Sequence, residues 1–179
     1  MKPEIADWPA DSNQNCAQMI TEKDYRDAMG RFATGVAIVT ATKANGEPAG
    51  ATINTITSVS MRPPLLLWCL ATSAPSFSVF RDAGEFAVNI LPSHAGSLCR
   101  QFSHSGGDKF RGISYTMHPD GLPLLDDALA HIICSKWRRY PGGDHEIFVG
   151  QILRLEVRDD EPLIFYRGQL NALGQPLET

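Results

Sequence analysis

Residues 52–60 read Thr-Ile-Asn-Thr-Ile-Thr-Ser-Val-Ser and lead almost directly into the apolar run 65–70. Six of these nine side chains are small hydroxyls or an amide. Such groups can hydrogen-bond the edge of a heteroaromatic ring, a sugar-alcohol chain or a phosphate without adding charge. The same composition is also typical of an edge strand, because threonine favours strands. Composition alone therefore leaves a ligand-binding segment and a plain edge strand about equally open.

Two shorter motifs carry side chains that could act on a ligand. Asp-Lys-Phe at 108–110 lies in the long loop that we predict for residues 103–123, where a lysine can meet a phosphate as a point charge. Gly-Asp-His at 143–145 lies at a turn before a strand, where a histidine can contact a ligand or move a proton. Each motif also has an ordinary interpretation, as a solvated loop lysine and as a structural or exposed histidine.

Other common chemistries are not indicated. The histidines at 94, 104, 118, 131 and 145 form no pair at metal-ligand spacing, so we expect no metal site. The sequence has no Gly-x-Ser-x-Gly, no P-loop and no Gly-x-Gly-x-x-Gly motif. The acidic clusters at 126–127 and 159–161 lie in turn-like contexts and are interpreted as solvated faces.

Composition restricts the class of protein further. The chain has 179 residues, 43% of them hydrophobic and 20% charged, as expected for one globular domain. Its net charge of −4 argues against nucleic acid as the main partner, because phosphate neutralisation needs a basic surface. The local basic cluster at 136–139 is interpreted as a solvated face.

The four cysteines, at 16, 69, 99 and 134, form no Cys-x-x-Cys pair and predict no disulfide framework. The first residues lack the apolar core of a signal peptide, and no run approaches the roughly 20 apolar residues of a membrane helix. We therefore expect a soluble cytoplasmic protein that has no contact with a membrane.

Residues 1–20 show no periodicity and predict an irregular N-terminal arm, followed by a single domain over 21–179. Thr21 is a candidate N-cap, with Asp24 three residues on. Tyr25 and Phe32 belong to a stripe at helical spacing, together with Met29. A stripe of this kind usually packs into a core.

β-rich stretches occupy most of the remaining chain. Short helices are expected at 76–81 and 93–102, and Asn-Gly at 45–46 predicts a hairpin turn. The continuous apolar run 65–70 predicts a strand that is buried on both faces. The predicted strands are 35–42, 49 through the polar stretch, 65–70, 85–91, 130–140, 145–157 and 162–170. Because they follow one another without alternating helices, we predict a mainly β fold with a mostly antiparallel barrel and short flanking helices.

The order of these segments resembles the short-chain flavin reductase family over about residues 22–173. Residues 25–36 match the opening helix and first strand of the family. Residues 52–60 and the two prolines at 63–64 match its Thr-x-Asn-Ser-Phe-Thr-Ser-Val-Ser segment, with Thr55 in place of Ser and Ile56 in place of Phe. Further matches lie at 86–91, 108–110, 143–145 and 162–168. Several motifs in the same order make the resemblance specific.

The resemblance implies a split β-barrel of the FMN-binding type, with FMN or FAD as the flavin. In similar proteins the polar segment contacts the flavin ring and ribityl chain, and the segment after the buried strand helps to hold the phosphate. Carried over onto this sequence, the implied flavin-binding residues are Thr52, Asn54, Thr55, Ser58, Val59, Ser60, Cys69, Leu70, Ala71, Ser76, Phe77, Lys109 and Phe110. Residues 73–77 lack the arginine of the family's Ser-Arg-Thr-like pattern, so Lys109 becomes the expected source of positive charge.

The implied activity is hydride transfer from NADH or NADPH to the flavin, with His145 as the residue that contacts the nicotinamide. The resemblance also implies a homodimer that supplies reduced flavin to a separate monooxygenase. Three alternatives remain open on the sequence. They are a flavoredoxin-like electron carrier without efficient NAD(P)H turnover, a related split-barrel pyridoxamine phosphate oxidase, and a module that only binds protein.

Overall fold

A computed structural model describes residues 20–174 and divides the chain into two compact units, residues 1–32 and 33–179. Helix α2 (Glu22–Met29) belongs to the first unit. As predicted, Thr21 is its N-cap. The amide of Asp24 donates to the Thr21 hydroxyl at 3.1 Å, and the Asp24 carboxylate accepts from the Thr21 amide at 3.3 Å. The predicted arm lies outside the described residues apart from residue 20, and the boundary of the predicted domain stays a prediction.

The apolar stripe of α2 does not form a core. The helix has no buried residue, and Phe32 just beyond it is 73% exposed, so the prediction that the stripe packs inward is wrong. Helical spacing shows only that these side chains share one face of the helix. It does not supply a surface for that face to pack against.

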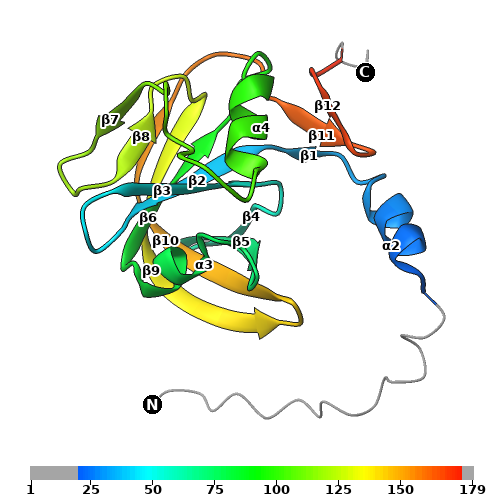
Figure 1. Cartoon of the computed structure of the whole chain (residues 1–179), viewed down its shortest axis with the longest axis horizontal. Helices are drawn as coiled ribbons and strands as arrows, with labels where there is room; N and C mark the ends of the chain where they lie inside the picture. Colours follow the sequence, from blue (N-terminus) through cyan, green and yellow to red (C-terminus); the bar gives the residue numbers. More distant parts are fainter. Residues whose placement is uncertain (1–19, 175–179) are drawn as a thin grey trace. The chain divides into compact units, whose positions relative to one another are not determined.

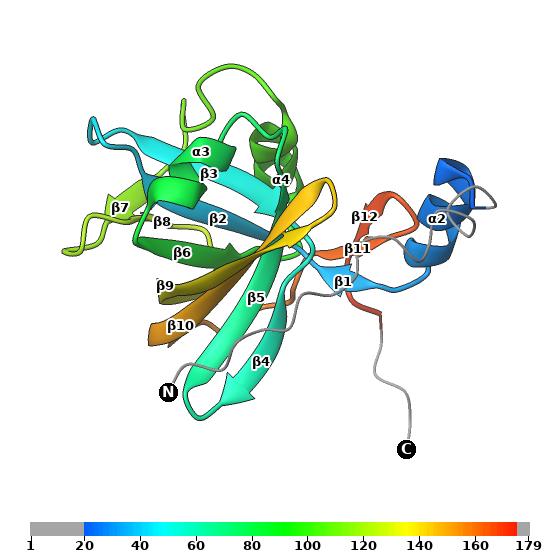
Figure 2. The same cartoon turned by 90° about the horizontal axis from the view of Figure 1, so that it is seen from below.

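The second unit is built on a seven-stranded antiparallel sheet with the strand order β3-β2-β6-β9-β10-β5-β4 (Figure 1). Figure 2 shows the strands fanning from β6 through β9 and β10 to the long β4–β5 hairpin. This arrangement confirms the predicted mainly β, mostly antiparallel fold. The strands are β2 (Ala37–Thr42), β3 (Pro48–Ile53), β4 (Thr57–Met61), β5 (Pro64–Ala71), β6 (Glu85–Ile90), β9 (Ala130–Gly142) and β10 (His145–Val157).

The polar stretch 52–60 is not one strand, contrary to the prediction. It begins at the end of β3, leaves the sheet over residues 54–56 and re-enters it as β4. Because β3 and β4 are the two outer strands of the order, this three-residue crossover carries the chain from one edge of the sheet to the other. The stretch thus spans the opening of the curled sheet.

Strand β5 alternates in burial, so the prediction of burial on both faces is wrong. Leu66, Trp68 and Leu70 are buried, whereas the residues between them are partly exposed. In an antiparallel barrel one face of each strand meets the core and the other faces outward. The Trp68 ring stacks on Phe148 of β10 with 4.4 Å between ring centroids, and this pair lies at the centre of the barrel core.

Two other predictions are corrected. The predicted loop 103–123 contains strand β7 (Tyr115–Met117), which pairs with β8 (Pro123–Leu125). The predicted last strand is instead the hairpin of β11 (Ile164–Tyr166) and β12 (Gln169–Asn171), and β11 also pairs with the short strand β1 (Thr34–Gly35). Arg167 and Gly168, at the hairpin turn, both have positive φ, 50° and 76°. That backbone twist suits two-residue hairpin turns.

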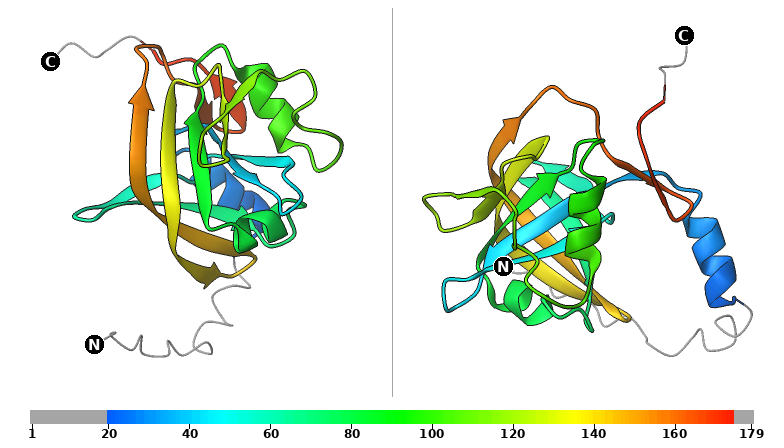
Figure 3. Two further views of the ribbon diagram at one scale, coloured as in Figure 1. Left: turned by 90° about the vertical axis from the view of Figure 1, so that its left-hand side faces the viewer. Right: turned by 45° about the horizontal axis from the view of Figure 1, so that its top comes forward.

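Both predicted helices of this unit are present, as α3 (Phe77–Asp82) and α4 (Gly96–Ser103). Leu98 and Phe102 face inward as predicted and are buried. Helix α4 packs along β2 and β3, which the right-hand view of Figure 3 shows. A Cβ built on Gly50 of β3 would lie 2.5 Å from the Phe102 ring, so α4 approaches β3 as closely as it does because Gly50 has no side chain.

Buried polar groups join β8 to the main sheet. The Asn89 amide donates to the Ile38 carbonyl at 2.9 Å and to the Thr40 hydroxyl at 3.1 Å, and its oxygen accepts from the Leu125 amide at 2.9 Å. This buried amide has hydrogen-bond partners for both its nitrogen and its oxygen, so its role is structural. None of the helices within residues 20–174 is long and apolar enough to span a membrane.

The close packing around Gly150 of β10 gives a first prediction. A Cβ at this position would lie 2.5 Å from the Phe86 ring and 2.9 Å from the Cys134 Cβ. We expect Gly150→Ala to lower the free energy of unfolding by about 1–3 kcal/mol, because overpacking forces neighbours apart. Chemical denaturation measures the change. Gly84→Ala is the control, since no atom lies within 4 Å of its Cβ position, and equal stabilities of the two variants would contradict the packing argument.

Candidate functional site

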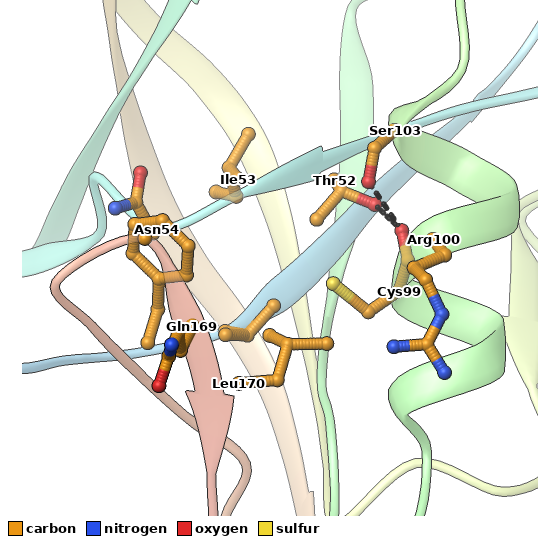
Figure 4. A pocket seen from close by; sticks show the side chains of 11 residues that line it. Thr52, Ile53, Asn54, Cys99, Arg100, Ser103, Gln169 and Leu170 are labelled. Carbon is orange, nitrogen blue, oxygen red and sulfur yellow. Dashed lines mark hydrogen bonds between the residues drawn. The ribbon is translucent and has the colours of Figure 1, made fainter.

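A cavity of about 650 Å³ opens beside the start of the crossover. It lies between the end of β3, helix α4 and the β11–β12 hairpin, as the close view in Figure 4 shows. Its lining consists mostly of neutral side chains: Val36, Thr52, Ile53, Asn54, Cys99, Arg100, Ser103, Phe165, Gly168, Gln169 and Leu170. Of the predicted site residues, this cavity brings together Thr52 and Asn54.

Two hydroxyls in this cavity already donate to the protein. The Thr52 hydroxyl donates to the Cys99 carbonyl at 2.8 Å, and the Ser103 hydroxyl donates to the same oxygen at 2.6 Å (Figure 4). These bonds fasten the end of β3 to α4. Each hydroxyl oxygen keeps its lone pairs, so Thr52 and Ser103 could accept a hydrogen bond from a ligand.

Other polar side chains that line the cavity have no hydrogen-bond partner of this kind. Within residues 20–174, the side chains of Asn54, Gln169 and Arg100 form no hydrogen bond or ion pair. Two amides offer both donors and acceptors, and a guanidinium offers donors and a positive charge. Together with the Phe165 ring, they could bind a flat, polar-edged molecule that carries an anionic group.

Thr55 does not line this cavity but holds the crossover to β5. The Cys69 amide donates to the Thr55 hydroxyl at 3.0 Å, and that hydroxyl donates to the Cys69 carbonyl at 3.2 Å. The backbone pairing of β4 with β5 ends at Thr57 and Leu67, so the Thr55 side chain bonds β5 beyond that ladder. The Thr55 hydroxyl, which was predicted to contact a ligand, is therefore already hydrogen-bonded to β5 of the barrel.

The predicted residues Ser58, Val59 and Ser60 lie on β4 and line neither this cavity nor the smaller one described below. Val59 is the extra residue of a bulge, since Ser58 pairs with Leu66 and Ser60 with Leu65, and it is 49% exposed. The Ser60 hydroxyl accepts from the Arg62 amide at 3.2 Å. These three residues lie on the outer strand β4, where Ser58 and Val59 are exposed and Ser60 is partly buried, and they form no wall of the cavity.

The far end of β5 lies next to the predicted histidine. Ala71 is the register partner of His145, and the Thr72 amide donates to the Asp144 carbonyl at 2.9 Å. The His145 Nδ1 lies 2.8 Å from the Asp144 carboxylate, and the side chain of His145 is 45% exposed. That hydrogen bond lowers the pKa of Asp144 and directs Nδ1 of the imidazole toward the carboxylate.

Two predicted residues of this part of the chain belong to the barrel core. Leu70 is buried, and Phe77 packs edge-on against Phe148 with 6.4 Å between ring centroids. A ligand could therefore reach Leu70 through its backbone but not through its side chain. The thiol of Cys69 is partly buried, and burial raises its pKa.

A second cavity, of about 230 Å³, brings Ser76 together with the predicted loop residues Lys109 and Phe110. The Lys109 ammonium donates to the Phe102 carbonyl at 2.9 Å and to the Gly50 carbonyl at 3.3 Å, and burial lowers the pKa of Lys109. Phe110 is buried against Phe102. These two loop residues thus join the loop to α4 and β3. The Ser76 hydroxyl is buried and finds no partner within the described residues.

The sequence analysis missed Arg100, Ser103 and Gln169. Arg100 and Ser103 share one face of α4 with Gly96 and Cys99, at the spacing i, i+3, i+4 and i+7. A small and polar stripe beside the apolar Leu98 and Phe102 was the signal that could have found them. No local pattern could have placed Gln169 there, because the hairpin reaches the cavity only through the tertiary fold.

The sequence of this chain is similar to those of known proteins. Residues 29–174 match the flavin reductase like domain. The chain is 38% identical over 158 residues to the reductase subunit of a flavin-dependent monooxygenase from Rhodococcus jostii, covering 88% of this chain and 80% of the relative. It is 37% identical over 153 residues to an FMN reductase (NADH) from Agrobacterium fabrum, covering 86% of this chain and 87% of the relative.

The fold is also close to solved structures. The NADH:FAD oxidoreductase from Streptomyces globisporus, in complex with NAD and FAD fragments, superposes with a TM-score of 0.82 at 32% identity. That match covers 87% of this chain and 94% of the relative. Another solved relative is longer, and this chain spans 53% of its length.

The bond between Thr55 and Cys69 gives a second prediction. We expect Thr55→Val to speed hydrogen exchange of the Cys69 amide by about 2- to 10-fold, because the amide loses its hydroxyl acceptor. Exchange measured by NMR checks this. Thr55→Ser keeps the hydroxyl and should exchange like the parent protein. Equal exchange in all three proteins would show that the hydroxyl does not protect the end of β5.

Proposed function

This chain belongs to the flavin reductase like family, and from that membership we propose that it is an NAD(P)H-dependent flavin reductase. The observation that carries the proposal is the cavity beside the crossover, which joins two unengaged amides, an aromatic ring and one guanidinium. The names of the relatives support the same reaction, since they include an FMN reductase and an NADH:FAD oxidoreductase.

The cavity suits a flavin by its chemistry. Its volume of about 650 Å³ lies within the usual range for ligand pockets. The edge of a flavin ring carries hydrogen-bond donors and acceptors in alternation, and the Asn54 and Gln169 amides can match either kind. Neutral amides can stabilise charge that develops on the ring without leaving a buried unpaired ion.

A bound flavin would supply the acceptor for the hydride that leaves C4 of the dihydronicotinamide. The protein's part is then to hold two flat rings against each other and to exclude water. In our proposal Asn54 binds the ring edge, Thr52 accepts a hydrogen bond, and Thr55 keeps the crossover in place. Ser58, Val59 and Ser60 form an outer rim, and the backbone of residues 69–71 continues this surface toward His145.

His145 is proposed to contact the nicotinamide. The support is its place at the end of β5, beside Ala71, on a hairpin turn that leaves the ring partly exposed. The Asp144 carboxylate accepts from Nδ1 and thereby orients the imidazole, which leaves Nε2 free to hydrogen-bond a carboxamide. Asp144 is a positioning residue in this scheme.

The cofactor preference is proposed only in part. The relatives' names carry both FMN and FAD, so we propose that either flavin serves as acceptor. The same names give NADH as the reductant, and we therefore propose that this protein prefers NADH to NADPH. Because relatives are reductase components of monooxygenases, we also propose that reduced flavin passes to a separate flavin-dependent monooxygenase.

We further propose a homodimer in the cytoplasm. Large apolar side chains stay exposed on three strands of the main sheet, with Met61 on β4, Trp137 on β9 and Leu155 on β10 exposed by 86%, 49% and 60%. Exposed apolar surface of this kind is typical of protein interfaces. The three described cysteines are free thiols, which suits a reducing compartment.

The third prediction tests the reaction itself. Purified protein should oxidise NADH when FMN or FAD is added, and the flavin should lose its visible absorbance under anaerobic conditions. NADPH and each flavin complete the preference matrix. A protein that binds flavin tightly but leaves NADH and NADPH untouched would instead be the electron carrier that the sequence left open. Failure to bind any flavin would contradict both interpretations.

The fourth prediction concerns the histidine. We expect His145→Ala to raise the KM for NADH by about 2- to 10-fold, the effect of one lost hydrogen bond, with little change in the KM for FMN. Steady-state kinetics with each substrate varied in turn measures the split. His104→Ala is the matched control, because this exposed histidine lines neither cavity. A larger effect on FMN than on NADH would place His145 at the flavin instead.

A further inference from the structure

Arg100 gives the main cavity its positive charge. Every other side chain that lines this cavity within residues 20–174 is neutral, since burial raises the pKa of the Cys99 thiol. No carboxylate of the described residues lines it either. A neutral pocket with one guanidinium is suited to a ligand that is mostly uncharged but carries an anionic group at one end.

Arg100 is an exposed residue whose guanidinium lies at the wall of the cavity. It lies over Gly96, because a Cβ built on that glycine would be 3.8 and 3.9 Å from the two terminal nitrogens of Arg100. The same Cβ would be 3.6 Å from the Leu170 side chain of β12. Figure 4 shows the Arg100 side chain extending from α4 beside Cys99 and toward Leu170. These distances to the Cβ position are ordinary van der Waals distances, and they place the guanidinium beside Gly96 and Leu170 at the cavity wall.

In the smaller cavity, the other place where an anion could bind, both lysines already have partners. Lys43 pairs with Glu47 at 2.9 Å, and Lys109 donates to two backbone carbonyls. The Asp108 carboxylate lines the same cavity and adds negative charge. Residues 73–77, just after β5, contain no arginine or lysine. By contrast, Arg100 has no anionic partner within the described residues.

We infer that Arg100 binds the phosphate group of the flavin. The inference rests on the proposed function and names the part of the site that grips the anionic end of the substrate. An arginine presents several N–H donors in a planar fork that matches phosphate geometry, and such charge-assisted bonds are stronger than neutral ones. The Asn54 and Gln169 amides would then contact the uncharged part of the same molecule.

The test compares FMN with riboflavin, which lacks the phosphate. We expect Arg100→Met to raise the Kd for FMN by about 5- to 30-fold and to change the Kd for riboflavin by less than about twofold. Quenching of flavin fluorescence measures both constants without turnover. Arg100→Lys keeps the charge but loses the fork, so its Kd for FMN should lie between those of the parent and Arg100→Met.

Arg138→Met is the matched control, since this exposed arginine of β9 lines neither cavity and forms no hydrogen bond within the described residues. Its FMN affinity should equal that of the parent. Thermal melts of all variants check that Arg100→Met remains folded.

Three results would overturn the assignment. They are an equal loss of affinity for FMN and riboflavin, an unchanged affinity for FMN, and an effect confined to the KM for NADH, which would move Arg100 to the nicotinamide dinucleotide. Failure of the proposed function is distinguishable, because the parent protein itself would then bind no flavin or oxidise no NADH. If the parent protein bound FMN without oxidising NADH, the Kd values for FMN and riboflavin would by themselves test the role of Arg100.

Discussion

The crossover at residues 54–56 is the constraint on which this structure depends. A sheet that curls into a barrel leaves two outer strands, and here they are β3 and β4, consecutive in the chain. Three residues bridge them, and two threonines hold the bridge in place. Thr52 bonds the end of β3 to α4, and Thr55 bonds the crossover to β5. Where the chain leaves the sheet, backbone and side-chain groups are not committed to a ladder, and the main cavity opens there.

The polar residues of the site fall into two groups, according to whether their side chains form hydrogen bonds with the protein. Thr52, Thr55 and Ser103 have hydroxyl hydrogens directed at backbone carbonyls, so they mainly hold the walls together. Asn54, Gln169 and Arg100 stand beside them without a partner in the described structure. The distinction cannot be made from residue type, since a threonine is equally able to do either. It follows from which carbonyl lies within reach in the folded protein.

Tightly packed side chains lie behind the walls of the site. The Trp68 ring is stacked on Phe148 and edge-on to Phe80 and Phe86, which fills the barrel beneath β5. On the outer side, Gly50 lets the Phe102 ring approach β3, and the Lys109 ammonium bonds carbonyls of both elements. A half-buried lysine with two carbonyl partners is costly to disturb, because removing it would leave polar groups unsatisfied. The loop lysine therefore supports the site from behind.

The sequence by itself determined the mainly β class, the mostly antiparallel pairing of the strands, the capping of α2 and the inward face of α4. These depend on periodicity, turn residues and capping, which act between neighbours in the chain. It also directed attention to the polar stretch and, through the resemblance, to a flavin. Only the tertiary structure decided that this stretch is a crossover between sheet edges, that Lys109 bonds carbonyls, and that Arg100 and Gln169 face one cavity. Those facts join segments far apart in the chain, and local patterns carry no information on which distant groups will meet.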